Sequence, residues 1–505
     1  MESQKYSSRV QKFFGFYRNR RKEQFSDSEI VYEVPLTEEL FDVQMDLLST
    51  KKMQSQFENF IVAVAGRLIT PNIKPQTGPD GGGDGKVDAE TFAVSSDISD
   101  RWYVGNGGAR GEEYWALAIS CKSKWKDKVE SDIAKIVETK RGYTKILFFT
   151  NQYIKADKRL EVESSLSDRH GIKVSIFDRQ WCKHAVFLHG CLDLALSELG
   201  FSDKYKKKHV TIGPYDNRRQ ERLSAIEKDI LRPIDGLDTD YVDELVEAFI
   251  LSRNLERPRT ETEGRYYRAV EQCKIHGTEP QLFNLIYDHG WTSFFWFEDI
   301  TTAYQDYLKL KEYVDRDCSV ARLEKLTNLK TVLQSAVTMG IVAIPKILDE
   351  DEYIRKLETK LSGDSRRKAS HLFLRLHVAE QDLIYRVRQK EALASELARL
   401  KPLLLEAASC LDISFESQYE VMRILSENFE DSPEFDKMLD ELSERLCESR
   451  QSASAARIRL DRAQAYLDKD RPKEAVRHLS FCVYAFEREE CLNELIQSSG
   501  LMGLA

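Results

Sequence analysis

Two residues far apart in the sequence form the strongest candidate for chemistry. Asp88 lies near the end of the glycine-rich segment GPDGGGDGKVDAE, and Lys122 follows the apolar run YWALAIS. Side chains alternate along a strand, so Ser120 and Lys122 would share one face while Cys121 points to the other. If the two segments pair, Asp88 lies opposite them. A carboxylate can hold Mg²⁺ and an attacking water, and a lysine can orient that water or steady a phosphate.

A second carboxylate, Glu58, strengthens this interpretation. It lies in QSQFENFIVAVAGRLI, where the 3.6-residue spacing of apolar residues predicts a helix over residues 54–69. Glu58 is on the apolar-leaning side, and a buried glutamate is costly without a cation or hydrogen bonds. The alternative is a glutamate at the stripe's edge that reaches water. Asp80 and Asp84 compete with Asp88, which we favour because its flanking sequence is strand-like.

Basic side chains near the candidate site could contact a nucleic-acid backbone. The alternating lysines that follow Lys122 extend the same strand end, and a second basic group follows the apolar strand KILFFTN. The alternative is a solvated charged surface. The expected nucleic-acid contacts are Lys124, Lys126, Lys128, Lys155, Lys158 and Arg159.

The pattern of the surrounding elements predicts an α/β domain with a mixed sheet covered by helices. After the first helix, strands are expected over 86–94 and 114–124, followed by a helix over 129–142. Continuous apolar runs then predict buried strands at 145–151 and 172–178. This domain is expected to span residues 51–201.

The rest of the chain divides around that domain. Residues 1–50 form a lead-in whose segment RVQKFFGFYRNRRKEQ is either a packing segment or a nucleic-acid or membrane surface. Residues 202–219 read as a charged linker, and residues 220–505 as an all-α domain. Near its end, ASAARIRLDRAQAYLDKDRPKEAVRHLSFCVYAFE resembles a tetratricopeptide helix pair, the alternative being an unspecified bundle. The small, apolar ending SSGLMGLA predicts a truncated chain or a capping partner.

Composition excludes several other classes. Residues 1–210 hold 33 Lys and Arg against 30 Asp and Glu, whereas the remainder holds 42 against 54, so only the first part suits nucleic acid. The second part suits a protein partner or self-association. No signal peptide or membrane span is expected, and nine scattered cysteines without a C-x-x-C pair indicate a reduced, cytoplasmic protein. In DGKVD, Val87 follows the lysine where a P-loop needs Ser or Thr, so nucleotide hydrolysis is not expected.

The order of these motifs resembles the restriction-endonuclease-like PD-(D/E)xK nucleases, with Mrr and bacterial antiphage effector nucleases as the nearest branches. The resemblance covers residues 51–195 and implies hydrolysis of DNA phosphodiester bonds with Mg²⁺ or Mn²⁺. It implies that Asp88 is the metal-binding aspartate, Lys122 the strand lysine and Glu58 the helix acid. Ser120 stands where the family usually has Glu or Gln. Either Glu58 compensates, or the site has lapsed and the chain acts as a scaffold.

Overall fold

The computed structural model describes residues 14, 15, 18, 21–75, 87–92, 113–230, 238–341, 350–389, 394–415, 419, 422, 425 and 432–505. The chain divides into two compact units, residues 1–299 and residues 300–505. The first unit contains a mixed α/β region followed by helices, and the second is helical in its described part. The predicted order of an α/β region before an α-helical region is therefore confirmed.

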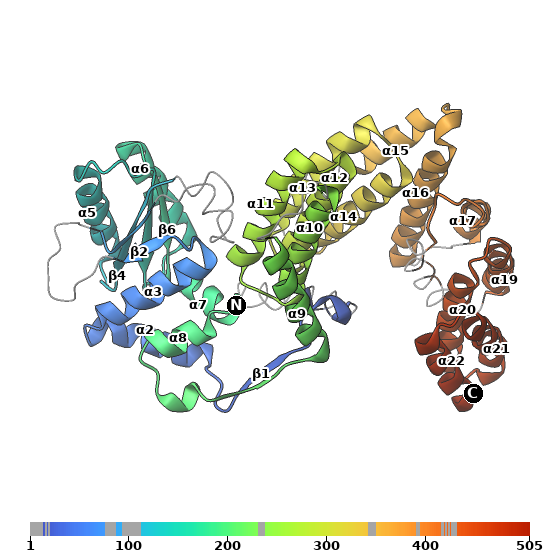
Figure 1. Cartoon of the computed structure of the whole chain (residues 1–505), viewed down its shortest axis with the longest axis horizontal. Helices are drawn as coiled ribbons and strands as arrows, with labels where there is room; N and C mark the ends of the chain where they lie inside the picture. Colours follow the sequence, from blue (N-terminus) through green and yellow to red (C-terminus); the bar gives the residue numbers. More distant parts are fainter. Residues whose placement is uncertain are drawn as a thin grey trace. The chain divides into compact units, whose positions relative to one another are not determined.

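The α/β region is built on a five-stranded sheet of order β2-β3-β4-β5-β6 (Figure 1). The first three strands form an antiparallel meander, and β4, β5 and β6 are parallel. The helices between the parallel strands provide the crossovers that parallel pairing requires. The strands are β2 (Ile73–Pro75), β3 (Ala89–Thr91), β4 (Trp115–Ser120), β5 (Lys145–Thr150) and β6 (Lys173–Phe177).

Helices cover both faces of this sheet. Leu117 and Ile119 of β4 face one hydrophobic core, whereas Ala116 and Ala118 face the other. All six β4 residues are buried, which explains why the strand reads as an uninterrupted apolar run. The first core is covered by α2 (Glu38–Thr50), α3 (Gln54–Leu68), α7 (Arg179–Phe187) and α8 (Leu192–Glu198), and the second by α5 (Trp125–Glu138) and α6 (Ala156–His170).

The lysines after β4 do not continue the strand, so that prediction was wrong. The strand ends at Ser120, a short loop contains Lys122, and α5 begins at Trp125. Lys124 is the N-cap residue, and Lys126 and Lys128 belong to the helix. The segment is helical because Val129, Ile133 and Ile136 form a buried apolar stripe at helical spacing. The burial of this stripe stabilises a helix more than the alternation of lysines favours a strand.

A two-stranded ribbon lies outside the main sheet. Strand β1 (Glu29–Tyr32) pairs antiparallel with β7 (Lys208–Thr211), and α9 (Pro214–Asp229) follows. The segment expected as a linker, 202–219, therefore contains a strand and the start of a helix. Asp27 accepts hydrogen bonds from the backbone N–H groups of Tyr215 (3.0 Å) and Asp216 (2.9 Å). These bonds join the base of the ribbon to the N-terminus of α9.

Described residues within and next to the aromatic and basic N-terminal segment pack against the end of α12 (Glu279–Phe295). Phe14 is buried and meets Phe294 edge-on, at 5.5 Å between ring centroids. Phe25 stacks on Trp296, and the guanidinium of Arg21 lies 4.5 Å from the Trp291 ring centroid. These contacts favour the packing interpretation of this segment. The helices of this part of the unit are α10 (Asp238–Asn254), α11 (Arg259–His276) and α12 (Glu279–Phe295).

The second unit contains only helices among its described residues. The predicted helix pair is present as α20 and α21, whose shared core contains Ala456, Ala463, Ala475 and Cys482. No helix in the described ranges is both long and apolar enough to cross a bilayer. The helices are α13 (Ile300–Arg316), α14 (Val320–Thr338), α15 (Glu350–Leu361), α16 (Lys368–Gln389), α17 (Ala394–Ala407), α19 (Pro433–Glu448), α20 (Ser452–Leu467), α21 (Pro472–Arg488) and α22 (Leu492–Leu504). Short 3₁₀ turns cover Lys22–Gln24, Asp203–Tyr205 and Ser365–Arg367.

Candidate active site

The candidate site lies where β3 and β4 separate. Their ladder reaches only to the pair Ala89 and Leu117, after which the Asp88 N–H donates to the Leu117 carbonyl at 3.1 Å. Beyond this point, no strand among the described residues pairs with the edge of β4 that faced β3. The Asp88 carboxylate accepts the next free N–H on that edge, from Ile119, at 2.6 Å. Asp88 is thereby fixed at the point where the strands separate.

The Gln54 side chain takes the remaining backbone groups of the same edge. Its Nε2 donates to the Ile119 carbonyl at 2.9 Å, and its Oε1 accepts from the Cys121 N–H at 3.0 Å. The same Nε2 donates to Oε1 of Glu58 at 3.0 Å. Helix α3 therefore binds the end of β4 through one amide, and this amide also holds Glu58.

The electrostatics of the site centre on Asp88. Burial raises the pKa of Asp88 from 3.8 to about 6, although the hydrogen bond from the Ile119 N–H opposes the rise. The charges of Glu58 and Asp132 raise it further, and Lys128 lowers it. The structure thus brings Asp88 and Glu58 close enough to repel each other. A cation that binds beside this carboxylate would stabilise its ionised form.

Glu58 also acts on the thiol that precedes Lys122. Burial, and secondarily the charge of Glu58, raise the pKa of Cys121 to about 12. A thiol with that pKa stays protonated at neutral pH, so Cys121 is no nucleophile here. Its backbone, rather than its sulfur, contributes to the site.

Asp132 is a site residue that the sequence analysis missed. It lies on α5 with 8% of its surface exposed, and it forms an ion pair with Lys128 one turn earlier. Its charge contributes to the raised pKa of Asp88. The available signal was an aspartate between Val129 and Ile133 in an otherwise apolar stripe. Lys128, expected to contact phosphate, is engaged by Asp132.

Ser120 and Lys122 have different roles in the structure. Ser120 is only 2% exposed, and its Oγ accepts a hydrogen bond from the Lys122 N–H at 3.2 Å. The hydroxyl therefore shapes the turn after β4. The Lys122 side chain is exposed, and within the described ranges its ammonium has no hydrogen-bond or ion-pair partner. It is not among the largest influences on the pKa of Asp88.

The other expected nucleic-acid contacts are dispersed. Lys124, Lys126, Lys155 and Lys158 are exposed at the starts of α5 and α6. Arg159 lies 3.7 Å from the buried carboxylate of Asp178, which caps α7. Four of the six predicted basic residues are thus exposed, whereas Lys128 and Arg159 have acidic partners in the fold.

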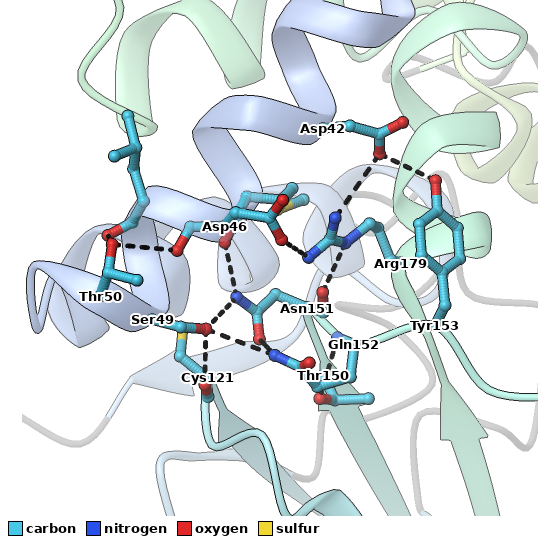
Figure 2. Close-up of polar contacts among 12 residues, drawn as sticks. Asp42, Asp46, Ser49, Thr50, Cys121, Thr150, Asn151, Gln152, Tyr153 and Arg179 are labelled. Carbon is cyan, nitrogen blue, oxygen red and sulfur yellow. Dashed lines mark hydrogen bonds and ion pairs between the residues drawn. The ribbon is translucent and has the colours of Figure 1, made fainter.

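A polar network fixes the opposite side of the loop after β4 (Figure 2). Ser49 of α2 donates its hydroxyl to the Cys121 carbonyl at 2.8 Å. Asn151, which follows β5, donates to Ser49 Oγ at 2.9 Å and to the Met45 carbonyl at 2.7 Å. The buried guanidinium of Arg179 donates to the Asn151 carbonyl at 2.6 Å and pairs with a carboxylate of α2. The network joins α2, β4, β5 and α7.

The donor types of this site suit a hard divalent cation, for which Asp88 and Glu58 would be the ligands. The relevant observation is that burial, and secondarily the charges of Glu58 and Asp132, raise the pKa of Asp88. Among the described residues, no three His, Cys, Asp or Glu side chains converge as a complete ligand set. Asp80 and Asp84 of the glycine-rich segment lie outside the described residues.

No protein-family model, curated protein or solved structure matches this chain. The functional assignment therefore depends on the residues and their arrangement.

Proposed function

We propose that the α/β region is a metal-dependent nuclease that hydrolyses DNA phosphodiester bonds. The observation that carries the proposal is Asp88, held at the separation of β3 and β4 with a pKa raised by burial and by nearby acids. Perturbed carboxyl groups of this kind are typical of functional sites. Exposed lysines at the start of α5, the helix that carries Asp132, offer positive charge to a nucleic acid.

Asp88 and Glu58 are the proposed metal ligands, with Mg²⁺ or Mn²⁺ as the ion. A bound ion of this type makes a coordinated water more nucleophilic and neutralises charge on the phosphate. Asp132 would add negative charge near these two ligands, where position 120 has no acid, without completing the ligand set. The ammonium of Lys122, which has no partner among the described residues, would orient the phosphate or the attacking water.

The helical part of the chain is the proposed regulatory region, since uncontrolled DNA cleavage would harm the host cell. Its excess of acidic residues suits a protein partner or a second copy of the chain. We propose that the protein is the effector of a bacterial antiphage system, controlled through these helices. Protection from phage that is lost in an Asp88→Asn variant produced at the same level would support this role.

The direct test is cleavage of supercoiled and linear duplex DNA with Mg²⁺ or Mn²⁺, with and without a chelator. Lys122→Ala and Asp88→Asn are each expected to lower the rate at least about 100-fold, because one removes a cation and the other a ligand near the reacting phosphate. Lys173→Ala, at an exposed lysine that begins β6, is the matched control and should cut normally. Equal cleavage by all three variants would exclude this site.

A scaffold function is the second candidate. It is favoured by Ser120, whose hydroxyl serves the turn, and by the incomplete ligand set among the described residues. Chelator-sensitive cutting by the purified protein would exclude this alternative. An RNA substrate in the same assay would test whether the site prefers RNA.

A further inference from the structure

We infer that Gln54 is a positioning residue, whose side-chain amide binds the end of β4 as a neighbouring strand would and holds Glu58 against it. The inference rests on the proposed nuclease function, because it concerns the alignment of the same site. Gln54 touches no reacting atom in this scheme and acts through the residues that it binds.

The geometry of the amide carries the argument. A peptide group of a neighbouring strand would offer β4 one donor and one acceptor, and the Gln54 amide offers both. Its Nε2 and Oε1 meet the Ile119 carbonyl and the Cys121 N–H at 2.9 and 3.0 Å. An alanine offers neither group, and a glutamate offers only acceptors. Glutamine is thus the side chain that fits both bonds.

The second amide proton extends this contact to Glu58. Gln54 is the first residue of α3, and Glu58 lies one turn later on the same helix face. Because Nε2 donates to Glu58 at 3.0 Å and to β4 at 2.9 Å, the carboxylate is held beside the strand end. Without this bond, a half-buried glutamate would turn toward water.

The peptide that precedes Lys122 is held from two sides. Gln54 accepts the Cys121 N–H, and Ser49 donates to the Cys121 carbonyl at 2.8 Å (Figure 2 shows the Ser49 side). The next N–H, that of Lys122, is bonded to Ser120 Oγ. Gln54 therefore fixes the backbone from which Lys122 extends, as well as the carboxylate of Glu58. These two groups share no direct contact in the described structure, and Gln54 sets their spacing.

The structural test is amide hydrogen exchange at Cys121 in three full-length variants. Gln54→Ala removes the acceptor, so exchange at Cys121 should accelerate by at least about fivefold. Gln54→Glu keeps an acceptor for that N–H, so exchange there should stay near the wild-type rate. Gln56→Ala, on the same helix without a bond to β4 or Glu58, is the control. Unchanged exchange in Gln54→Ala would overturn the inference.

The functional test compares cleavage rates in a double-mutant cycle with Glu58→Gln. Gln54→Ala and Gln54→Glu should each lower kcat by about 10-fold to 100-fold, since misplacement of catalytic groups has effects of that size. If Gln54 acts through Glu58, adding Gln54→Ala to Glu58→Gln should cost less than about threefold more. Fully additive losses would overturn this route of action. Absence of cleavage by the wild type would overturn the nuclease proposal, while the exchange measurement would still decide whether Gln54 holds the β4 edge.

Discussion

Replacing Asp88 with asparagine should stabilise the protein at alkaline pH while abolishing activity. The raised pKa means that the folded state disfavours the ionised carboxylate. Asparagine has a similar shape, carries no charge and can still accept the Ile119 N–H through its carbonyl oxygen. The variant therefore keeps the hydrogen bond and removes the repulsion from Glu58 and Asp132.

The magnitude follows from the two pKa values of Asp88. Below pH 3.8, folded and unfolded chains both bind the proton, and the stabilisation due to the raised pKa is fully present. As the pH rises through about 6, the folded state loses its proton and this stabilisation is lost. A shift from 3.8 to about 6 corresponds to about 3 kcal/mol. Asp88→Asn should therefore gain up to about 3 kcal/mol at pH 8, and much less at pH 4.

The assay is urea unfolding in a chelator at pH 4 and pH 8, followed by fluorine NMR of labelled tryptophans. Trp115 in β4 and Trp125 at the start of α5 report on this sheet separately from the helical unit. Adding Mg²⁺ at pH 8 should stabilise the wild type more than the variant, because the wild type offers two anionic ligands and the variant keeps only Glu58. Asp168→Asn, at an exposed position of α6, is a control for the substitution itself.

One result would refute this reasoning. If Asp88→Asn destabilises the sheet equally at both pH values, the carboxylate is a structural hydrogen-bond acceptor, and the electrostatic account of the site is wrong.

Two further predictions concern the rest of the fold. A β-carbon on Gly213 would lie 2.1 Å from Cγ of Asp27. Gly213→Ala should therefore displace the Asp27 carboxylate from the N-terminus of α9 and lower the free energy of unfolding of the first unit by about 1–2 kcal/mol in chemical denaturation. Serine at the same position should cost at least as much. In the second unit, Arg462 is 1% exposed and pairs with Asp436, so Arg462→Met should cost about 3 kcal/mol and lower the melting temperature of that unit. The exposed Arg477→Met should change stability by less than about 1 kcal/mol, and equal losses in both would contradict the burial argument.

The sheet was predictable from sequence because burial on both faces leaves a clear signal. Strands β4 and β5 are continuous apolar runs, and their observed bounds fall inside the predicted ones. The approach of Glu58 to Asp88 was also anticipated, from a carboxylate on an apolar helix face and an aspartate in strand-like sequence. Whether these residues bind metal stays a prediction.

The parts that escaped prediction depend on contacts between distant segments. Gln54 is polar and lies at a helix start, so no local pattern distinguishes it from a solvated residue. The lysines after Lys122 alternate like a strand, but the apolar stripe of α5 decides their conformation. Strands β1 and β7 are four residues each and exposed, and they pair across most of the first unit's sequence. Short exposed strands carry little hydrophobic periodicity.

The pairing of β1 with β7 has a consequence for the chain's architecture. Tyr32 faces Lys208, so the chain enters and leaves the α/β region at adjacent points. The segment between β1 and β7, residues 33–207, is thus an insertion in the sequence of the helical part of the first unit. Phe25 and Trp296, from the two sides of this insertion in the sequence, stack on each other. A domain inserted in this way can be exchanged for another, or removed by joining β1 directly to β7 through a tight turn. The insertion also means that the helices of the first unit must form contacts with an N-terminal segment that is distant in sequence before this unit can complete its folding.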